Sequence, residues 1–482
     1  MTALLAGLRD LNWLVLAYVV LIDLAQTTLL TAAGIELRRY RLATRHAMRQ
    51  RLLGSSVLPR ISVLAPAHNE AATVVASVTA LLTLRYPQLE VVVVNDGSRD
   101  DTVGTLQRAF DLEAVPPAFR RVVPTAQVRT VFRSRSNPRL VVVDKDNGGK
   151  ADALNAGLCV ATGELVCAID ADTLIEPDAL MPMARPFLEY DDCVAVGGVI
   201  RVVNGARIQH ARVQQARAPR RFLPGVQSVE YLRAFLFGRL GWNLLGGNLI
   251  ISGAFGLFRR EDVLATGGYL HGSVGEDMEI VARLRRRTRE GVPARVIFVP
   301  DPVAWTEVPE TLRVLGRQRD RWHRGLMQTL WTYRSSWGRP QDGALGLVVY
   351  PYFVLVELLA PVVEVIGLAG LTLGLLVDAV DVKFAVAFFL FAYGYGILLS
   401  MVAILLDTVT AAVAPTRRDI LWLALWALLE PLGYRQLTVI WRLRGLLGAF
   451  RGRSDWGVMT RTGFSEEGAQ ALNPVPTRVR AS

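Results

Sequence analysis

The sequence predicts an α/β domain with a largely parallel sheet, joined to apolar helices that meet a lipid bilayer. Three observations support this prediction. From residue 61 the chain alternates short apolar runs with helix-like patterns, as strand–helix units do. Elsewhere it contains apolar stretches of the length that a membrane crossing needs. Finally, 51% of its 482 residues are hydrophobic, which is too apolar for a wholly soluble chain.

The first apolar stretch, Trp13 to Ala33, has one charged residue, Asp23, and about the length of one crossing. It lacks a basic leader and a small-residue cleavage site, so residues 1–35 are expected to form a retained anchor. Residues 36–60 form a basic juxtamembrane segment. Its arginines are Arg38, Arg39, Arg41, Arg45, Arg49, Arg51 and Arg60. Because basic flanks stay in the cytoplasm, the middle region is expected to face it from the plasma (inner) membrane.

Two further crossings are expected within residues 344–406, which makes the protein multi-pass. Phe384 to Leu406 carries no charge. Ala344 to Val377 is longer than one crossing and contains two prolines and two glutamates, so we expect a helix that starts in the interface and then spans. Within residues 418–482, Glu430-Pro431 and Arg435 interrupt the apolar pattern, which predicts re-entrant or interfacial helices before a C-terminal tail.

The α/β region is expected over residues 61–309. Its predicted strands are Ile61 to Pro66, Leu89 to Asn95, Leu140 to Asp144 and Leu165 to Ile169. Its predicted helices are Glu70 to Leu82, Thr102 to Phe110 and Ala151 to Val160. Between Asp111 and Asn137, three prolines, five arginines and the lack of periodicity predict a loop or a poorly ordered insertion.

Two later segments mix arginines with aromatic residues and leucines at helical spacing. They are Ala218 to Gly238, within the α/β region, and Glu310 to Trp337, within a helical segment of residues 310–340. This pattern suits helices that lie in the headgroup plane, and the alternative is amphipathic helices packed on the sheet alone. The chain has a net charge of +11, and its arginines cluster beside the predicted membrane spans. This position favours anionic lipid over nucleic acid as the partner. The three cysteines lack metal-site spacing and are expected in the core.

Asp170-Ala171-Asp172 directly follows a predicted strand. Two residues of strand separate the carboxylates by roughly 6.5 Å and place them on one side. One can meet a ribose or phosphates and the other a hard cation, because Mg²⁺ and Mn²⁺ are held by one or two carboxylates plus phosphate oxygens. The sequence has neither glycine-rich phosphate loop, so acids and a metal would have to hold a diphosphate. The alternative is two solvated loop acids.

Other polar turns also follow predicted strands. Asn95-Asp96-Gly97-Ser98 and Pro66-Ala67-His68-Asn69-Glu70 should border one crevice at the carboxyl edge of the sheet. Alternatively, Asp96 caps the next helix. Lys145 and Lys150 stand near a helix N-terminus, where cations are unfavourable, so a bound anion explains them better than a solvated glycine turn does.

Two motifs lie further along the chain. Gly275-Glu276-Asp277 precedes the helical stretch Met278 to Arg287 and can supply a general base or an acidic helix cap. Gln318, Arg321 and Trp322 share one face of a helix. There the arginine can reach a phosphate while the indole stacks on a sugar.

The motifs, in this order, resemble those of the processive family 2 glycosyltransferases, which include cellulose, chitin, hyaluronan and poly-N-acetylglucosamine synthases. The resemblance runs from about Ile61 to Trp322 and more loosely to the C-terminus. It implies a GT-A-like cytoplasmic domain that transfers a β-linked sugar, with inversion, from a UDP-sugar to a polysaccharide or glycolipid acceptor. UDP-N-acetylglucosamine is favoured as donor over UDP-glucose.

Two rival interpretations are single transfer to a lipid or lipid-linked acceptor and an inactive assembly subunit. The small number of spans favours single transfer, whereas the Gln318 to Trp322 motif disfavours it. Retention of the acidic motifs and of Trp322 disfavours an inactive subunit. For an enzyme that extends a polymer, so few spans suggest a homo-oligomer or an export partner subunit.

The resemblance also implies residue roles. Nucleotide-sugar binding falls to Glu70, Asp96, Lys145, Lys150 and Asp170. Catalysis falls to Glu276 and to Asp277 as the base, and the Mg²⁺ or Mn²⁺ ion to Asp172. Acceptor and diphosphate contacts fall to Ser252, Gly253, Gln318, Arg321 and Trp322.

Two sequence details qualify these roles. Chitin and hyaluronan synthases usually have proline where Ala254 stands, which disfavours those two products. Trp456 and Arg461 resemble a gating element of hyaluronan synthases with two residues inserted, and the alternative is an exposed tail.

Overall fold

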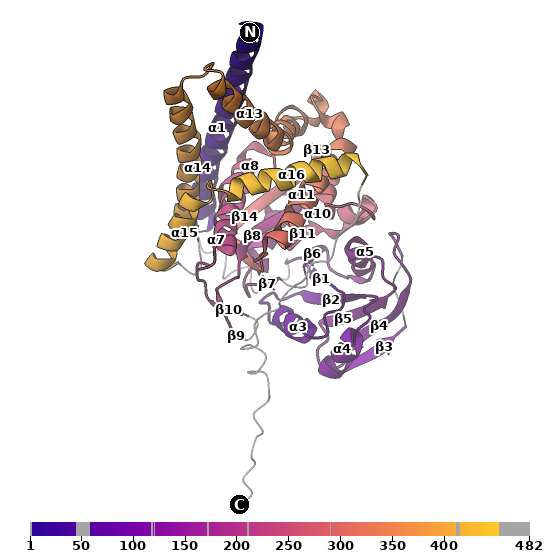
Figure 1. The fold of residues 1–482 in the computed structure, drawn as a ribbon. Coiled ribbons are helices and arrows are strands. Elements are labelled where there is room, and N and C mark those ends of the chain that lie inside the picture. The colour runs from indigo at the N-terminus through magenta and orange to yellow at the C-terminus, as the bar shows by residue number, and fades with distance from the viewer. Residues whose placement is uncertain are drawn as a thin grey trace, which may run out of the picture.

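The computed structural model describes residues 2–44, 58–116, 119, 121–170, 173–209, 212–289, 291–410 and 415–452. Asp172, Trp456 and Arg461 lie outside the described residues, so their predicted roles stay predictions. Within the described part, one large sheet carries helices on both faces, and long apolar helices extend from one end of the molecule (Figure 1).

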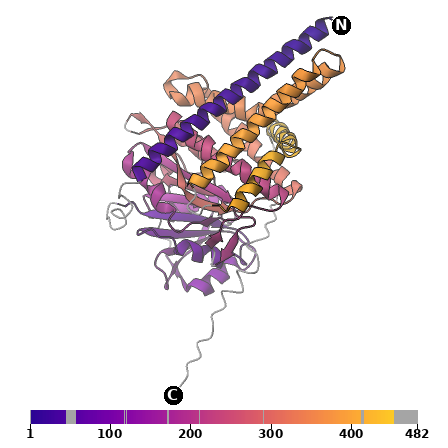
Figure 2. The same cartoon turned by 90° about the vertical axis from the view of Figure 1, so that its left-hand side faces the viewer.

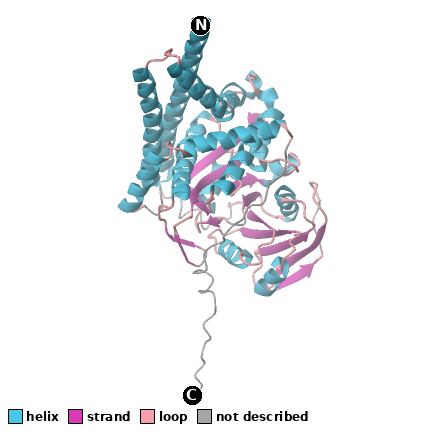
Figure 3. Cartoon of the chain, in the orientation of Figure 1, coloured by secondary structure: helices cyan, strands magenta, loops and turns pink. Residues whose placement is uncertain are grey.

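The sheet has ten strands in the order β3-β4-β5-β2-β1-β6-β11-β8-β14-β7. Figure 3 shows these strands among the surrounding helices. The first seven in chain order are β1 (Ile61–Ala67), β2 (Leu89–Asp96), β3 (Leu112–Val115), β4 (Val128–Ser134), β5 (Leu140–Lys145), β6 (Leu165–Ile169) and β7 (Leu174–Ile175). The others are β8 (Cys193–Val202), β11 (Phe255–Arg259) and β14 (Arg295–Thr306). Two separate hairpins are β9 (Arg207–Gln209) with β10 (Arg212–Gln215), and β12 (Thr288–Arg289) with β13 (Val292–Pro293).

The centre of the sheet is parallel. Strands β5, β2, β1 and β6 run in the same direction, whereas β11 runs antiparallel between β6 and β8. Successive side chains of β2 enter two different cores, with Val91 and Val93 on one face and Val92 and Val94 on the other. Burial on both faces explains why this strand reads as an unbroken valine run. The parallel strands also bring their carboxyl ends to one edge.

Helices cover both faces of the sheet. The first face carries α3 (Val74–Leu82), α4 (Thr102–Phe110) and α6 (Leu180–Glu189), whose buried residues join the larger core. The second carries α5 (Lys150–Val160), α9 (Arg260–Ala265) and α10 (Glu276–Arg285), apart from a few α10 residues that reach the larger core. The predicted α/β sheet is thus confirmed.

The prediction of a loop or a poorly ordered insertion between Asp111 and Asn137 was wrong for residues 112–115 and 128–134. The structure places β3 and β4 there as an antiparallel extension of the sheet onto β5. Val131 and Phe132 of β4 are buried, and Arg129 and Arg133 are exposed. These arginines interrupt the apolar pattern of β4, which lies between β5 and the edge strand β3, and they obscured the strand signal.

Two helices are long and apolar enough to cross a membrane: residues Ala6–Ala43 of α1 (Thr2–Thr44), and α14 (Val382–Thr410). Both contain an expected span. A third, bent unit joins Leu345–Leu358 to Ala360–Leu376 at 47°. Figure 2 shows α1 and the long orange helices leaving the sheet domain in the same direction. Thr27 of α1 and Tyr395 of α14 lie 2.5 Å apart between their hydroxyl oxygens, so these helices are in contact.

Further helices pack between the apolar helices and the sheet. The first predicted interfacial segment, Ala218 to Gly238, contains α7 (Phe222–Leu232) and most of a π-helical turn η1 (Arg233–Arg239). Helix α8 (Leu240–Leu245) follows directly after it. The second contains α11 (Leu312–Thr332). Within the predicted re-entrant segment, α15 (Arg417–Leu429) and α16 (Tyr434–Phe450) have 13 and 17 residues, against about 20 for a crossing.

Helix α16 packs closely along α11 because glycines line their contact. A Cβ atom at Gly445 would lie 2.5 Å from the carbonyl oxygen of Asp320, and one at Gly316 would lie 2.8 Å from the Trp441 indole. An ion pair joins another two distant segments, since Glu430, at the C-terminal end of α15, pairs with Arg233 of η1. The C-terminal helices therefore belong to the same packed body as the sheet.

Candidate active site

Two hollows lie at the carboxyl edge of the sheet, on either side of the end of β6. The first is lined by residues of β1, β2, α3 and the two ends of the β6–β7 connection. The second is lined by Lys150 and Leu154 of α5, Ala168 of β6, residues 251–253, Phe258, Tyr269, Glu276 and Asp277. The strand ends thus bring together side chains that lie more than 100 positions apart in the chain.

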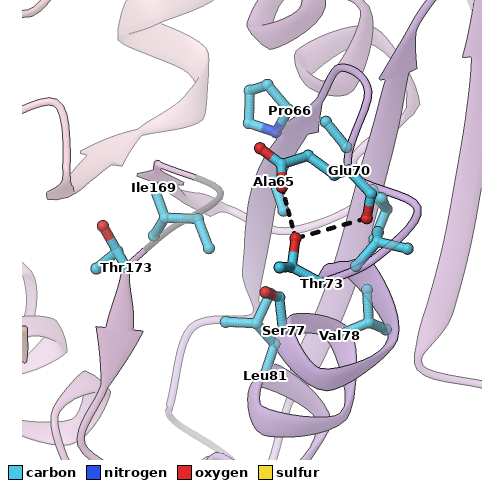
Figure 4. A pocket seen from close by; sticks show the side chains of 12 residues that line it. Ala65, Pro66, Glu70, Thr73, Ser77, Val78, Leu81, Ile169 and Thr173 are labelled. Atoms are coloured by element: carbon cyan, nitrogen blue, oxygen red, sulfur yellow. Dashed lines mark hydrogen bonds between the residues drawn. The ribbon is translucent and has the colours of Figure 1, made fainter. Parts of the chain in front are cut away.

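Glu70 lies at the rim of the first hollow (Figure 4). The Thr73 hydroxyl donates a hydrogen bond of 2.5 Å to its carboxylate, and the Thr102 hydroxyl accepts one from its backbone N–H. The walls are mainly apolar, and across the hollow the buried Thr173 hydroxyl has no hydrogen-bond partner among the described residues. An apolar slot with polar groups at its rim suits a planar ring such as a nucleobase.

Asp96 does not face this slot in the structure. Its carboxylate accepts hydrogen bonds from the backbone N–H groups of Gly148 and Gly149, at 2.9 and 2.8 Å, and lies 2.5 Å from the Lys145 ammonium. Asp96 does not cap α4, which was its alternative role. The N-cap residue of α4 is Asp101, and the Asp100 carboxylate accepts a hydrogen bond from the N–H of Thr102, the first residue of the helix. Asp96 therefore shapes the glycine turn that leads into α5.

Lys145 is paired within the protein, and its predicted contact with a nucleotide-sugar stays a prediction. Its ammonium is fully buried and contacts the carboxylates of Asp96 and Asp152 and the carbonyl oxygen of Asp146. These three contacts use all three donors of the ammonium, so it has none to offer a bound anion in this conformation. The lysine instead fastens the ends of β2 and β5 to helix α5.

Lys150 opens α5 and points into the second hollow. Its ammonium lies 2.6 Å from Asp170, which directly follows β6, and 3.0 Å from Glu276 of α10. Burial disfavours its charge, but the Asp170 and Glu276 carboxylates outweigh this and raise the pKa of Lys150. Burial also raises the pKa of Glu276, against the effect of the lysine. One positive charge thus stands among three predicted acidic site residues.

Asp277 lies beside this cluster and is held by the backbone. One carboxylate oxygen accepts from the Gly253 N–H at 3.1 Å and the other from the Met278 N–H at 2.8 Å. The positive charges of Lys150 and Arg239 act on it, and burial lowers the pKa of Arg239 to about 10 against the effect of Asp277. A half-exposed carboxylate fixed in this way can accept a proton at a defined point of the hollow.

The loop with Ser252 and Gly253 lines the same hollow. A Cβ atom on Gly253 would lie 3.0 Å from the Lys150 ammonium and 3.5 Å from an Asp277 oxygen. A side chain at this position would crowd the Lys150 ammonium, so glycine leaves space between the cation and the carboxylate. The structure thus collects Lys150, Asp170, Ser252, Gly253, Glu276 and Asp277 at one place.

Helix α11 carries the other predicted group. Trp322 is 44% exposed, Gln318 and Arg321 are half-buried, and the Gln318 side-chain oxygen is buried without a partner among the described residues. Arg319, which sequence reasoning did not single out, is buried against Glu230 and lies under the Trp322 ring at 4.3 Å. The sequence did contain a sign that Arg319 is buried. Arg319 follows Leu315 by four residues, so the two share one face of α11, and Leu315 is buried.

The two motif helices touch through glycine. A Cβ atom on Gly325 of α11 would lie 3.0 Å from the Cα and N atoms of Gly275, at the start of α10. Real Cβ atoms tolerate this distance only if the neighbouring backbone moves. The contact places the Asp277 turn directly against the helix that carries Trp322.

Gly325→Ala is therefore expected to push α11 away from α10 and to lower sugar transfer by about tenfold, because small displacements of positioned groups are costly. Nucleotide affinity should stay within about threefold, since neither Gly325 nor Gly275 lines the first hollow. Initial rates and nucleotide binding measure the two effects. Gly394→Ala in α14 is the matched control, since no atom lies within 4 Å of its added methyl. Equal activity of the two variants would contradict this role for the contact.

The described residues contain no group of three or more His, Cys, Asp or Glu side chains that could hold a metal ion. Asp170, which is 30% exposed at the end of β6, is the one predicted acidic neighbour of Asp172 within the described part. Such a donor set fits a hard cation held by one or two carboxylates and mainly by the phosphates of a ligand. It does not fit a cage built by protein alone.

Comparison with known proteins agrees with this arrangement. Residues 62–265 match Glycosyl transferase family 2, and residues 165–428 match Glycosyl transferase family group 2. The chain is 28% identical over 290 residues to a poly-beta-1,6-N-acetyl-D-glucosamine synthase of Staphylococcus epidermidis, which covers 60% of this chain and 59% of the relative. It is 28% identical over 274 residues to the Staphylococcus aureus (strain COL) synthase, which covers 57% and 56%. The matches thus span less than two thirds of these relatives.

Among solved structures, the chain resembles the mannosyltransferase PcManGT from Pyrobaculum calidifontis in complex with GDP-Man and Mn²⁺. The TM-score is 0.51 at 20% identity, over 90% of this chain and 99% of the other. At this identity the likeness concerns the fold, and it confirms the predicted GT-A-like architecture.

Proposed function

The chain belongs to the family 2 glycosyltransferases, and from this premise we propose that it is a membrane-bound, inverting β-glycosyltransferase that extends a polysaccharide from a UDP-sugar. UDP-N-acetylglucosamine is the proposed donor, in line with the synthases to which the chain is similar. The observation that carries the proposal is the single hollow that collects Lys150, Ser252, Gly253, Glu276 and Asp277 next to Asp170.

In this proposal the nucleoside occupies the slot beside Glu70 and Thr173, and the diphosphate lies toward Asp170 and Lys150. Asp170 and Asp172 would hold Mg²⁺ or Mn²⁺, which would neutralise charge on the diphosphate. The transferred sugar then lies in the second hollow, between Lys150 and Asp277. Lys150 adds a positive charge near the leaving group.

Asp277 is the proposed base. The acceptor hydroxyl loses its proton to the Asp277 carboxylate while its oxygen forms a bond to the anomeric carbon. The bond from that carbon to the phosphate oxygen breaks, and the nucleoside diphosphate leaves with the electron pair. The hydrogen bonds from Gly253 and Met278 hold the carboxylate in place for this step. Glu276 holds Lys150 in position beside it.

Trp322 is the proposed stacking surface for the terminal sugar of the acceptor, with Gln318 and Arg321 beside it. One face of its ring carries the Arg319 guanidinium, and 44% of the side chain remains exposed. We further propose that the anchor and the two later apolar helices hold the α/β domain at the cytoplasmic face of the membrane.

Trp322→Ala is expected to shorten the polymer, because it removes an aromatic contact of about 1 kcal/mol with each incoming chain end. Product length on a sizing gel measures this effect. Trp337→Ala is the control, since Trp337 has a similar exposure of 46% and lies outside α11. Polymer of normal length from the Trp322 variant would place the acceptor elsewhere.

The function itself is tested with the full-length chain in detergent, incubated with single UDP-sugars and either Mg²⁺ or Mn²⁺. The proposal expects a long product that depends on the metal and is lost with a chelator. One sugar added to a lipid-linked acceptor would favour single transfer. No product from any UDP-sugar, in the presence of intact protein, would overturn the proposal.

A further inference from the structure

Tyr269 lines the second hollow, yet the proposed mechanism gives it no role. It is 3% exposed, and its hydroxyl oxygen is buried without a hydrogen-bond partner among the described residues. A buried hydroxyl left unpaired costs free energy, and native proteins avoid this unless the group has a use. Burial raises the pKa of Tyr269, so its hydroxyl keeps its proton and can donate it.

The backbone of Tyr269 is held firmly by helix α5. The Asn155 side chain accepts a hydrogen bond from the Tyr269 N–H at 2.7 Å and donates one to its carbonyl oxygen at 2.9 Å. The preceding Gly268 has a φ of +74°, and a Cβ atom there would lie 2.4 Å from the Asn155 oxygen. A ring anchored in this way meets the hollow at a fixed point, as selective sites require.

The walls around Tyr269 are of two kinds. Leu154, Ala168, Ile251 and Phe258 give the hollow an apolar part, whereas Lys150, Ser252, Glu276 and Asp277 give it a polar part. In the proposed arrangement the transferred sugar lies in this hollow, so its C2 substituent, next to the anomeric carbon, is within reach of these walls. An N-acetyl group has a methyl for the apolar wall and a carbonyl oxygen for a hydroxyl donor. A plain hydroxyl at C2 is shorter and has no methyl.

We propose that the Tyr269 hydroxyl donates a hydrogen bond to the acyl oxygen of an N-acetylated donor sugar and thereby selects N-acetylhexosamine over hexose donors. This inference rests on the proposed function. The selectivity follows from the cost of the unpaired hydroxyl. A donor that lacks the acyl oxygen leaves the buried hydroxyl without a partner, and sites built to bond a polar group reject analogues that lack it.

The test is Tyr269→Phe, which removes only the hydroxyl. The ratio of kcat/KM for UDP-N-acetylglucosamine to kcat/KM for UDP-glucose is expected to fall by about five- to tenfold, as one lost neutral hydrogen bond predicts. The melting temperature without donor should not fall, because the hydroxyl has no partner to lose. A role in folding alone would lower the melting temperature and leave the ratio unchanged.

Tyr86→Phe is the matched control. Tyr86 is 2% exposed, and its hydroxyl donates to the Pro59 carbonyl oxygen at 2.6 Å, far from the hollow. This variant should lose stability and keep the wild-type donor ratio. An unchanged ratio in Tyr269→Phe, with active wild-type protein, would overturn the inference alone. Wild-type protein that uses neither donor would instead overturn the proposed function.

Discussion

Asp277→Asn is expected to lower sugar transfer by roughly a hundred- to ten-thousandfold, the range that general bases contribute. The variant keeps the shape of the side chain and one of its two acceptor oxygens, but an amide cannot take a proton from the acceptor hydroxyl. UDP affinity should stay within about threefold, because the carboxylate is bonded to Gly253 and Met278 on the acceptor side of the hollow. Single-turnover rates and calorimetric titration with UDP measure the two quantities.

Asp192→Asn is the control for this substitution. Asp192 precedes β8 and pairs with Arg295 at 3.0 Å, at the opposite edge of the sheet from the hollow. Its asparagine variant should transfer sugar at close to the wild-type rate. An Asp277 variant that loses UDP binding and transfer to the same extent would place Asp277 in the nucleotide site instead.

Arg319→Met is expected to lower the free energy of unfolding by about 3 kcal/mol and to shorten the polymer as well. Removing one partner of a buried ion pair costs about 3–5 kcal/mol, and the lower value applies because Glu230 is 30% exposed. The guanidinium lies 2.7 Å from Glu230 and 3.3 Å from the Tyr434 hydroxyl, and it supports the Trp322 ring. Denaturation in detergent and product sizing measure the two effects.

The double variant Glu230→Gln, Arg319→Met separates these effects. Without the carboxylate there is no unpaired charge, so the double variant should regain part of the lost stability. Its polymer should stay short, because Trp322 still lacks the guanidinium beneath it. If stability and polymer length recover together, the arginine acts on the product through folding and not through Trp322.

The sequence predicted much of the α/β domain because its strands are buried on both faces. The apolar runs of β2 and β6 are bounded by turn residues, and the predicted bounds lie within one residue of those observed. Helix α4 has the predicted bounds, as expected for a short amphipathic helix between turns. The edge strand β3 and its neighbour β4 were missed because they are half exposed, so polar residues interrupt their apolar pattern.

The positions of the site motifs could be predicted, but the partners of their charged side chains could not. The motifs follow predicted strands, and in the structure Lys150, Asp170 and Asp277 lie together at one edge of the sheet. The residues around Lys145 in the sequence do not indicate that its side chain pairs with Asp96. The two residues lie at the ends of different strands and are 49 positions apart in the chain. A lysine beside a helix N-terminus has the same local signal whether it binds a phosphate or a buried carboxylate.

The ion pairs between the sheet domain and the later helices restrict which substitutions and domain exchanges the protein can tolerate during evolution. Arg233 of η1 pairs with Glu430, and Arg201 of β8 pairs with Asp407 of α14, each across about 200 residues. A chimera that took its last helices from another protein would bring these arginines into the fold without their carboxylates. Substitutions at these positions are therefore expected to occur in pairs among homologues, so that the membrane helices and the catalytic sheet are inherited as one unit.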